Sequence, residues 1–316
     1  MKKEGITILV LSLIIIFLIP WSIMRWQKEE IPLGDFNIRV KMPGGNVETL
    51  ALEEYLVGVV AAEMPAEFDS EALKAQAVAA RTYAAKQISR RSDSDQGYDV
   101  DTTVQTQAWL TDTQMKVKWG WWGYWRYHKP VLDSVESTKG QVLVANGQYI
   151  DAFYHSSSGR KPTERAEEVW SSSRLYLQNV ESGETNQTRF VKTYTYTPNV
   201  LYQKLGISQT PQNFKASDFA IISQTTAGRA KEVRVLGKVF TAPQLRTLLG
   251  LASTDIEFTI QPEEIQLKTY GNGHAVGMSQ YGANDLGKAG STYSEILSHF
   301  YPGTQILALS KGNQNP

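Results

Sequence analysis

A single glutamate, Glu63, is the residue of this chain best placed to act as an acid. It ends a segment whose apolar side chains recur with the spacing of one buried helix face. These side chains are Leu52, Tyr55, Leu56, Val59 and Val60. Pro65 disfavours the helical conformation at Met64, so the helix is expected to end there. The free carbonyl groups of a helix end carry partial negative charge, which together with apolar neighbours should raise the pKa of Glu63.

A protonated carboxyl group suits the acid-catalysed cleavage of a glycosidic bond, in which it faces the leaving oxygen. Hydrolytic enzymes of this kind use two carboxylates about 5 to 10 Å apart. A sugar with a free 6-hydroxyl group can instead attack its own anomeric carbon, so that one carboxyl group serves both steps. The alternative is that Glu63 is an ordinary surface carboxylate like its neighbours. Those neighbours are Glu53, Glu54, Glu67 and Glu71.

Two other chemistries have weaker signals. Serine catalysis would pair His155 or His274 with a nearby serine. The candidate serines are Ser156, Ser157, Ser158 and Ser279. The G-x-S-x-G pattern of a nucleophile elbow is missed because Tyr281 occupies its last position. A metal site on the two histidines lacks further ligands at a known spacing. We therefore expect no metal and no cofactor.

The elements around Glu63 follow from the local patterns. Upstream, residues 36–51 alternate about a Pro-Gly-Gly-Asn turn, which predicts a hairpin leading into the Glu63 helix. Downstream, Asp69 or Ser70 can cap a second, alanine-rich helix. Farther along the chain, the pair Asn146-Gly147 predicts a tight hairpin that brings residues 155–159 to its end.

The C-terminal third contains two further signals. Residues 237–251 predict a strand followed by a short helix that closes at Gly250. The block 269–304 is rich in glycine before a helix from about Tyr293 to Phe300. Glycine there would let the backbone approach a ligand closely.

Aromatic rings are unusually dense at residues 109–127. Four of the eight tryptophans lie between residues 119 and 125 of this block, namely Trp119, Trp121, Trp122 and Trp125. Such rings fill a core, brace a membrane interface or stack on sugars. The sequence leaves these three roles open.

The overall charge indicates the class of binding partner, and the N-terminal segment indicates the cellular compartment. The chain has no cysteine, and its 32 Lys and Arg residues equal its 32 Asp and Glu residues. No net field therefore favours nucleic acid. Residues 5–24 form an uncharged apolar run of the length that crosses a bilayer, preceded by Lys2 and Lys3. We expect a retained anchor with a cytoplasmic N-terminus and an extracytoplasmic remainder; the alternative is a cleaved signal peptide.

Three blocks of sequence together resemble the stage II sporulation protein D family. They are EEYLVGVVAAEMPAEFDSEALKAQAVAARTYA, DAFYHSSSGRKPTERAEEVW with YLQNVES, and GNGHAVGMSQYGANDLGKAGSTYSEILSHFYPGT. The resemblance covers roughly residues 46–306. It implies a membrane-anchored lytic transglycosylase that cleaves peptidoglycan strands lacking stem peptides, leaving 1,6-anhydro ends, while a mother cell engulfs its forespore. It also implies partnership with stage II sporulation proteins P and M.

The resemblance assigns roles to individual residues. The catalytic glutamate of the family falls on Glu63, in agreement with the acid inferred from the helix end. Arg81 matches a position implicated in function, where it would orient the glycan or brace the cleft. The remaining expected substrate-binding residues are His155, Ser156, Ser157, Tyr176, His274 and Gln280.

Together these observations predict an α+β ectodomain with a helical pair and β-hairpins around a substrate groove, on a single N-terminal transmembrane helix. The expected division is a cytoplasmic tail at 1–4, the anchor at 5–24, a linker at 25–35, the catalytic ectodomain at 36–306, in one lobe or two, and a tail at 307–316. A non-catalytic peptidoglycan-binding scaffold of the engulfment complex is the alternative function.

Overall fold

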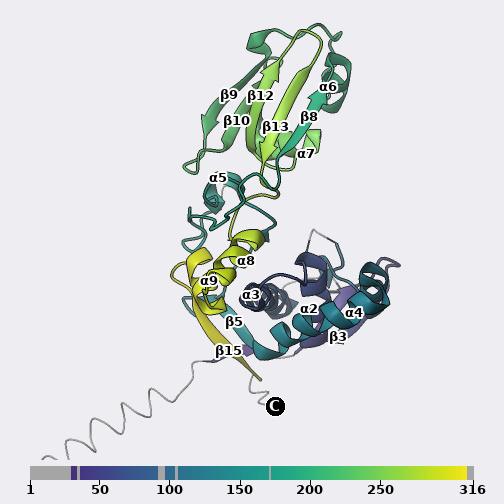
Figure 1. Ribbon diagram of the computed structural model, residues 1–316, viewed down its shortest axis with the longest axis vertical. Coiled ribbons are helices and arrows are strands. Elements are labelled where there is room, and N and C mark those ends of the chain that lie inside the picture. Colours follow the sequence, from purple (N-terminus) through teal and green to yellow (C-terminus); the bar gives the residue numbers. More distant parts are fainter. Residues whose placement is uncertain (1–29, 34–35, 92–96, 104–105, 171, 312–316) are drawn as a thin grey trace, which may run out of the picture.

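The computed structural model describes residues 30–33, 36–91, 97–103, 106–170 and 172–311. These residues form two lobes that follow one another along the longest axis of the molecule (Figure 1). The lower lobe combines several helices with short strands, and the upper lobe is mainly β-sheet. The short helix α5 (Ala166–Trp170) lies between them. Each lobe has its own cluster of buried apolar side chains.

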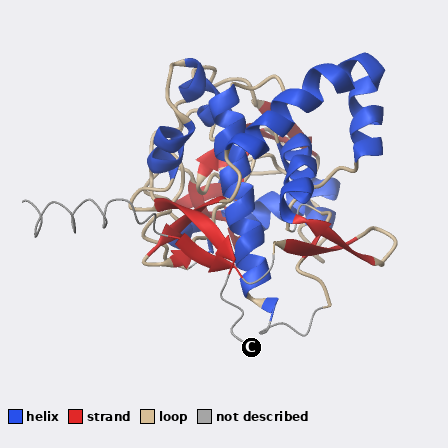
Figure 2. Ribbon diagram, turned by 90° about the horizontal axis from the view of Figure 1, so that it is seen from below, coloured by secondary structure: helices blue, strands red, loops and turns tan. Residues whose placement is uncertain are grey.

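The lower lobe is organised around helix α3 (Ser70–Ser89), which contacts the other long elements of that lobe. These are α2 (Leu52–Glu63), α4 (Asp112–Ser137), α8 (Gln280–Lys288), α9 (Tyr293–Phe300) and β5 (Gln141–Ala145). The alanines of α3 are fully buried and let its neighbours approach closely. Figure 2 shows these helices packed beside short strands, with no single large sheet beneath them.

The strands of the lower lobe form three small sheets. The largest has the order β1–β15–β5–β6, from β1 (Glu30–Leu33), β15 (Gln305–Lys311), β5 and β6 (Gln148–Tyr149). A second contains β3 (Val47–Ala51), β2 (Asn37–Lys41) and β4 (Val100–Asp101). The third pairs β7 (Tyr154–His155) with β14 (Met278–Ser279) in parallel. That last pair joins two segments more than 100 residues apart.

The upper lobe packs two antiparallel sheets against two helices. One sheet has the order β11–β10–β9 and the other β12–β13–β8. The strands are β8 (Lys192–Tyr196), β9 (Phe219–Gln224), β10 (Ala230–Val235), β11 (Lys238–Thr241), β12 (Asp255–Ile260) and β13 (Ile265–Tyr270). The helices are α6 (Pro198–Lys204) and α7 (Ala242–Leu249), and a 3₁₀ turn spans Ala216–Asp218.

Most of the local predictions are confirmed. Helix α2 ends at Glu63, with Met64 in an extended conformation (φ −127°, ψ 138°), and Asp69 caps α3. Strands β2 and β3 form the expected hairpin, as do β5 and β6. Asn146 and Gly147 both have positive φ, the requirement of the tight turn predicted there. Gly250, in the left-handed conformation, ends α7.

The fold-class prediction is right about the mixed α+β architecture and wrong about its membrane-spanning helix. No helix within the described ranges is long and apolar enough to cross a bilayer. The segment predicted to span, residues 5–24, lies outside the described residues. The tail expected from residue 307 is also wrong, because 307–311 belong to strand β15, which pairs with β1 and β5.

The aromatic block does not fill the core as a whole. Helix α4 kinks at Gly120 (φ 68°, ψ 172°), beyond which the tryptophan side chains point outward. Trp121, Trp122 and Trp125 are 67%, 86% and 66% exposed, whereas Trp119 packs against the lower core. Core packing is therefore wrong as an interpretation for three of the four tryptophans.

Candidate active site

A groove of 720 Å³ at the junction of the two lobes contains five of the eight side chains that were predicted to act in catalysis or substrate binding. The end of α2, the segment 106–107, strand β7, the C-terminal glycine loop and helix α7 all contribute to its lining. The lining residues are Glu63, Tyr83, Thr106, Gln107, Ala152, Phe153, Tyr154, His155, Ser156, Trp170, Arg246, Asn272, Gly273, His274 and Gln280. Glu63 is the one carboxylate among these described residues.

Glu63 is half-buried at the C-terminal end of α2. Its Oε1 atom accepts a hydrogen bond of 2.9 Å from the backbone nitrogen of Ala108. Its Oε2 atom makes no hydrogen bond with any residue in the described ranges. Burial raises the pKa of Glu63, against the opposing effects of the Ala108 hydrogen bond and the positive charge of Lys118. The direction matches the sequence prediction, and burial, which the apolar neighbours of Glu63 were expected to cause, is the main reason.

The hydrogen bond to Glu63 depends on how the segment before α4 packs against α2. Trp109 donates its indole N–H to Tyr55 O (3.1 Å), and the backbone nitrogen of Leu110 donates to Gly58 O (3.2 Å). A Cβ atom at Gly58 would lie 2.2 Å from the Trp109 indole nitrogen. Only glycine therefore allows this segment to lie on the helix and to aim the Ala108 N–H at the carboxyl group.

The opposite wall is held together by two loops in close contact. Ser157 and Asn272 exchange backbone hydrogen bonds of 3.0 and 2.8 Å. Gly159 and Gly271 both have positive φ, and a Cβ atom on either would lie 2.8 Å from the backbone of the other loop. The expected hairpin end and the glycine-rich loop thus form one surface, which presents His155 and His274 to the groove.

The two histidines are uncharged members of this wall. His155 Nε2 lies 2.7 Å from Ser158 Oγ, and His155 Nδ1 lies 3.3 Å from Val276 O. Burial holds the pKa of His155 well below its usual range. Burial, with the charge of Arg246, lowers the pKa of His274 to about 4. Both rings are therefore neutral near pH 7 and supply hydrogen-bonding groups and no charge.

Serine catalysis finds no support in this geometry. Ser158, the partner of His155, is 1% exposed and does not line the groove. Ser157 and Ser279 both donate hydrogen bonds to the buried carboxylate of Glu184, so their hydroxyl groups stabilise the loop junction. Ser156 alone of the four reaches the groove.

The groove brings together five of the residues expected to act there and leaves three outside. Glu63, His155, Ser156, His274 and Gln280 line it, whereas Arg81, Ser157 and Tyr176 do not. The hydroxyl group of Tyr176 accepts a hydrogen bond of 2.9 Å from the backbone nitrogen of Asp151, which anchors the loop behind the groove wall.

Arg81 is a fully buried cross-link of the lower lobe. Its guanidinium donates to both carboxylate oxygens of Glu53 on α2, at 3.0 and 2.7 Å. It also donates to Val135 O near the end of α4 (3.0 Å) and to Gln141 O at the start of β5 (3.2 Å). Arg81 was expected either to orient the glycan or to brace the cleft, and its position is that of a brace. These contacts occupy its guanidinium N–H groups and leave none for a ligand.

Several residues that line the groove were not predicted from the sequence. Trp170 is 40% exposed, and its ring centroid lies 4.9 Å from that of His274. Gln107 accepts a hydrogen bond from Tyr55 and donates to Tyr154, both at 3.3 Å. Arg246 comes from the upper lobe, on α7. The first of these ends a block used in the family resemblance, but no local pattern marks the other two.

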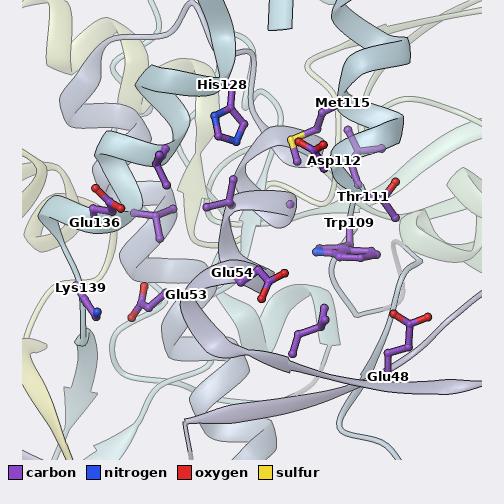
Figure 3. A pocket seen from close by; sticks show the side chains of 16 residues that line it. Glu48, Glu53, Glu54, Trp109, Thr111, Asp112, Met115, His128, Glu136 and Lys139 are labelled. Carbon is purple, nitrogen blue, oxygen red and sulfur yellow. The ribbon is translucent and has the colours of Figure 1, made fainter. Parts of the chain in front are cut away.

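A second cavity, of 580 Å³, lies between α2, α4 and β3 (Figure 3). Five acidic side chains line it together with His128, Lys139 and several apolar side chains. The acidic residues are Glu48, Glu53, Glu54, Asp112 and Glu136. Glu53 is engaged by Arg81, and hydrogen bonds from Lys116 and Tyr124 lower the pKa of Asp112. The groove contains Glu63, whose pKa is raised by burial, so the groove is the better candidate for acid catalysis.

Comparison with known proteins confirms the family resemblance of the sequence. A family model described as "SpoIID: Stage II sporulation protein" matches residues 44–144. The chain is 38% identical over 264 residues to stage II sporulation protein D of Bacillus subtilis (strain 168), an alignment covering 83% of this chain and 76% of that protein. The corresponding protein of Bacillus amyloliquefaciens is 36% identical over 264 residues, which cover 83% of this chain and 75% of the relative. The amidase enhancer of Bacillus subtilis (strain 168) is 31% identical over 80% of this chain and 40% of its own length.

Proposed function

Because this chain belongs to the stage II sporulation protein D family and is thus a sporulation protein, we propose that it is a lytic transglycosylase acting on peptidoglycan. In this reaction the glycosidic bond that follows muramic acid is cleaved without water. Strands that have lost their stem peptides are the proposed substrate. The products end in 1,6-anhydro-muramic acid.

One observation carries the proposal, namely that a single carboxyl group with a raised pKa lines a groove of sugar-binding size. A hydrolase normally needs a second carboxylate to activate water or to form a glycosyl intermediate. None of the other described lining residues is an Asp or a Glu. Intramolecular attack by the sugar's own hydroxyl group needs one carboxyl group only, which matches this lining.

The geometry of Glu63 suggests how both steps proceed. Because Ala108 N–H occupies Oε1, the proton is expected on Oε2, which is free to face the substrate. Oε2 donates this proton to the bridging oxygen as the bond from the anomeric carbon to that oxygen breaks. The carboxylate then faces the positive charge that develops at the anomeric carbon. It recovers a proton from the 6-hydroxyl group as the new bond from that oxygen to the anomeric carbon closes the ring.

Uncharged side chains around Glu63 are suited to bind the sugar while the proton is transferred. Gln107, Asn272 and Gln280 present amide groups to the groove, and Trp170 presents a partly exposed ring. An aromatic ring packs against the apolar face of a pyranose, while amides bind its hydroxyl and acetamido groups. These contacts fix the anomeric centre without adding a competing charge.

The proposed setting is outside the cytoplasm, at the septal wall that is remodelled during engulfment. Stripped strands must be supplied by an amidase that cuts the bond between muramic acid and the stem peptide. The name of one relative, amidase enhancer, supports a working relationship with such an enzyme. Stage II sporulation proteins P and M are the partners proposed from the family.

Mass spectrometry of products from peptide-free strands tests the proposal. The wild-type protein is expected to release fragments with 1,6-anhydro ends, whose mass is lower by one water than that of hydrolytic products. Fragments with ordinary reducing ends would instead indicate a hydrolase. Strand binding without any fragment would indicate a scaffold, and either result would overturn the proposal.

A further inference from the structure

Arg246 is an unpaired cation in the groove. Helix α7 carries it, and its Nε atom donates a hydrogen bond of 3.2 Å to Ala252 O, which fixes the stem of the side chain. Its two terminal nitrogens make no hydrogen bond or ion pair with any residue in the described part of the chain. Elsewhere in the protein, the half-buried or buried guanidinium groups of Arg39, Arg81, Arg160 and Arg229 each face a carboxylate.

The other groups of the groove leave the charge of Arg246 uncompensated. It is the one Lys or Arg among the described lining residues, and Glu63 is the one carboxylate. Burial raises the pKa of Glu63 and so favours its neutral form, and both groove histidines have lowered pKa values. Burial also lowers the pKa of Arg246, because water solvates its charge poorly there. A partly desolvated guanidinium without a counter-ion is suited to bind a carboxylate or another planar anion.

Arg246 also borders a side pocket of 180 Å³, which shares Trp170 and His274 with the groove. That pocket contains the carboxylates of Glu164 and Glu168. Glu164 is engaged by Arg229 and Thr225, and Glu168 by Thr226. These two carboxylates disfavour an anion in the side pocket, although the cation Lys231 also lines it. On the groove side, Glu63 is the one carboxylate among the described lining residues, so an anion is less disfavoured there.

We propose that Arg246 binds the free lactyl carboxylate of muramic acid, and thereby selects strands without stem peptides. This inference rests on the proposed glycan substrate. Muramic acid carries a lactyl ether whose carboxyl group is free in a stripped strand. In an unstripped strand the same carbon forms a neutral amide with the peptide, so it has neither the charge nor the second oxygen that a guanidinium binds in a bidentate manner.

Equilibrium binding tests the inference separately from catalysis. The probe is a set of peptide-free strands, either with free lactyl carboxylates or with these groups converted to methyl amides. Binding is measured to Glu63→Gln, which does not consume the strands, with and without the second change Arg246→Gln. With Arg246 present, amidation is expected to weaken binding about 10- to 100-fold, the range of a charge-assisted hydrogen-bonded pair. With Arg246→Gln the two strand types should bind alike.

Two further variants control for the possibility that Arg246→Gln changes the structure of the groove. Arg246→Lys restores the positive charge without the planar guanidinium group that binds a carboxylate through two parallel hydrogen bonds. It should recover part of the preference for free carboxylates. Lys231→Gln removes an exposed cation of the side pocket and should leave the preference unchanged. Equal binding of both strand types in the presence of Arg246, or a preference that survives in Arg246→Gln, would overturn the inference. Preference without any cleavage by the wild-type protein would refute the proposed enzyme and leave this inference standing.

Discussion

Glu63→Gln is expected to abolish the cleavage of peptide-free strands while leaving the fold and strand binding intact. Glutamine has the shape of glutamic acid and can still accept the hydrogen bond from Ala108 N–H. Its amide N–H protons are too weakly acidic to be transferred to the leaving oxygen. Loss of a general acid costs on the order of 10² to 10⁴ in rate, and more where the same group also acts in the second step. The release of anhydro-ended fragments, followed by mass spectrometry over time, measures the effect.

The stability of this variant provides the control. In the wild type the pKa of Glu63 is raised above its usual value, so burial costs stability once the carboxyl group ionises. This cost is absent at low pH and develops as the pH rises through the folded-state pKa. Glu63→Gln should therefore match the wild type at about pH 4 and be equally or more stable at about pH 8. A variant that cleaves at the wild-type rate would exclude Glu63 as the acid.

Arg81→Met is expected to lower the free energy of unfolding more than Glu63→Gln or Lys74→Met does, with little direct effect on strand binding. The buried guanidinium joins Glu53 on α2 to carbonyl groups near α4 and β5. Its removal takes one donor from each of these carbonyl groups and the charged partner from Glu53, which keeps a hydrogen bond of 3.2 Å from the backbone nitrogen of Gly140. Losing the partner of a buried charge typically costs about 3 to 5 kcal/mol. Glu53 keeps partial exposure and can rehydrate, so the lower end of that range is expected. Urea unfolding of the two proteins gives the difference.

Lys74→Met, on the same helix, is the matched comparison. Lys74 forms a partly exposed ion pair with Glu71 one turn away, and helix pairs of this kind contribute about 1 kcal/mol or less. Under conditions where Arg81→Met remains folded, its affinity for strands should equal that of the wild type. A variant with wild-type stability and weakened strand binding would return Arg81 to the substrate-binding role expected from sequence.

The position of Glu63 could be predicted because its causes are local. The apolar spacing of α2 and the restriction from Pro65 act within a few residues, and so do the Asn146-Gly147 turn and the Asp69 cap. The hydrogen-bond donor to Glu63 could not be predicted in this way. Ala108 lies 45 residues away, and it reaches the carboxyl group only because Gly58 allows close packing.

The features that could not be predicted have a common physical origin, because a local pattern does not specify the distant partner of a side chain. Arg81 has the spacing of a helix cation, but Glu53, 28 residues away, determines that it is a buried brace. The tryptophans after Gly120 have the composition of a core, yet the kink in α4 turns them outward. Arg246 reaches the groove only through the placement of the upper lobe, to which no motif in its own segment points.

The proposed catalysis depends on the protonation state of Glu63, and a direct titration of this carboxyl group tests it. With ¹³C-labelled glutamate, the signal of the Glu63 carboxyl carbon can be assigned by its absence in Glu63→Gln and followed by NMR from acid to neutral pH. The midpoint is expected above the ordinary value of 4.5, because burial disfavours the ionised form. A midpoint at or below 4.5 would mean an ordinary ionised carboxylate and would contradict the proposed acid.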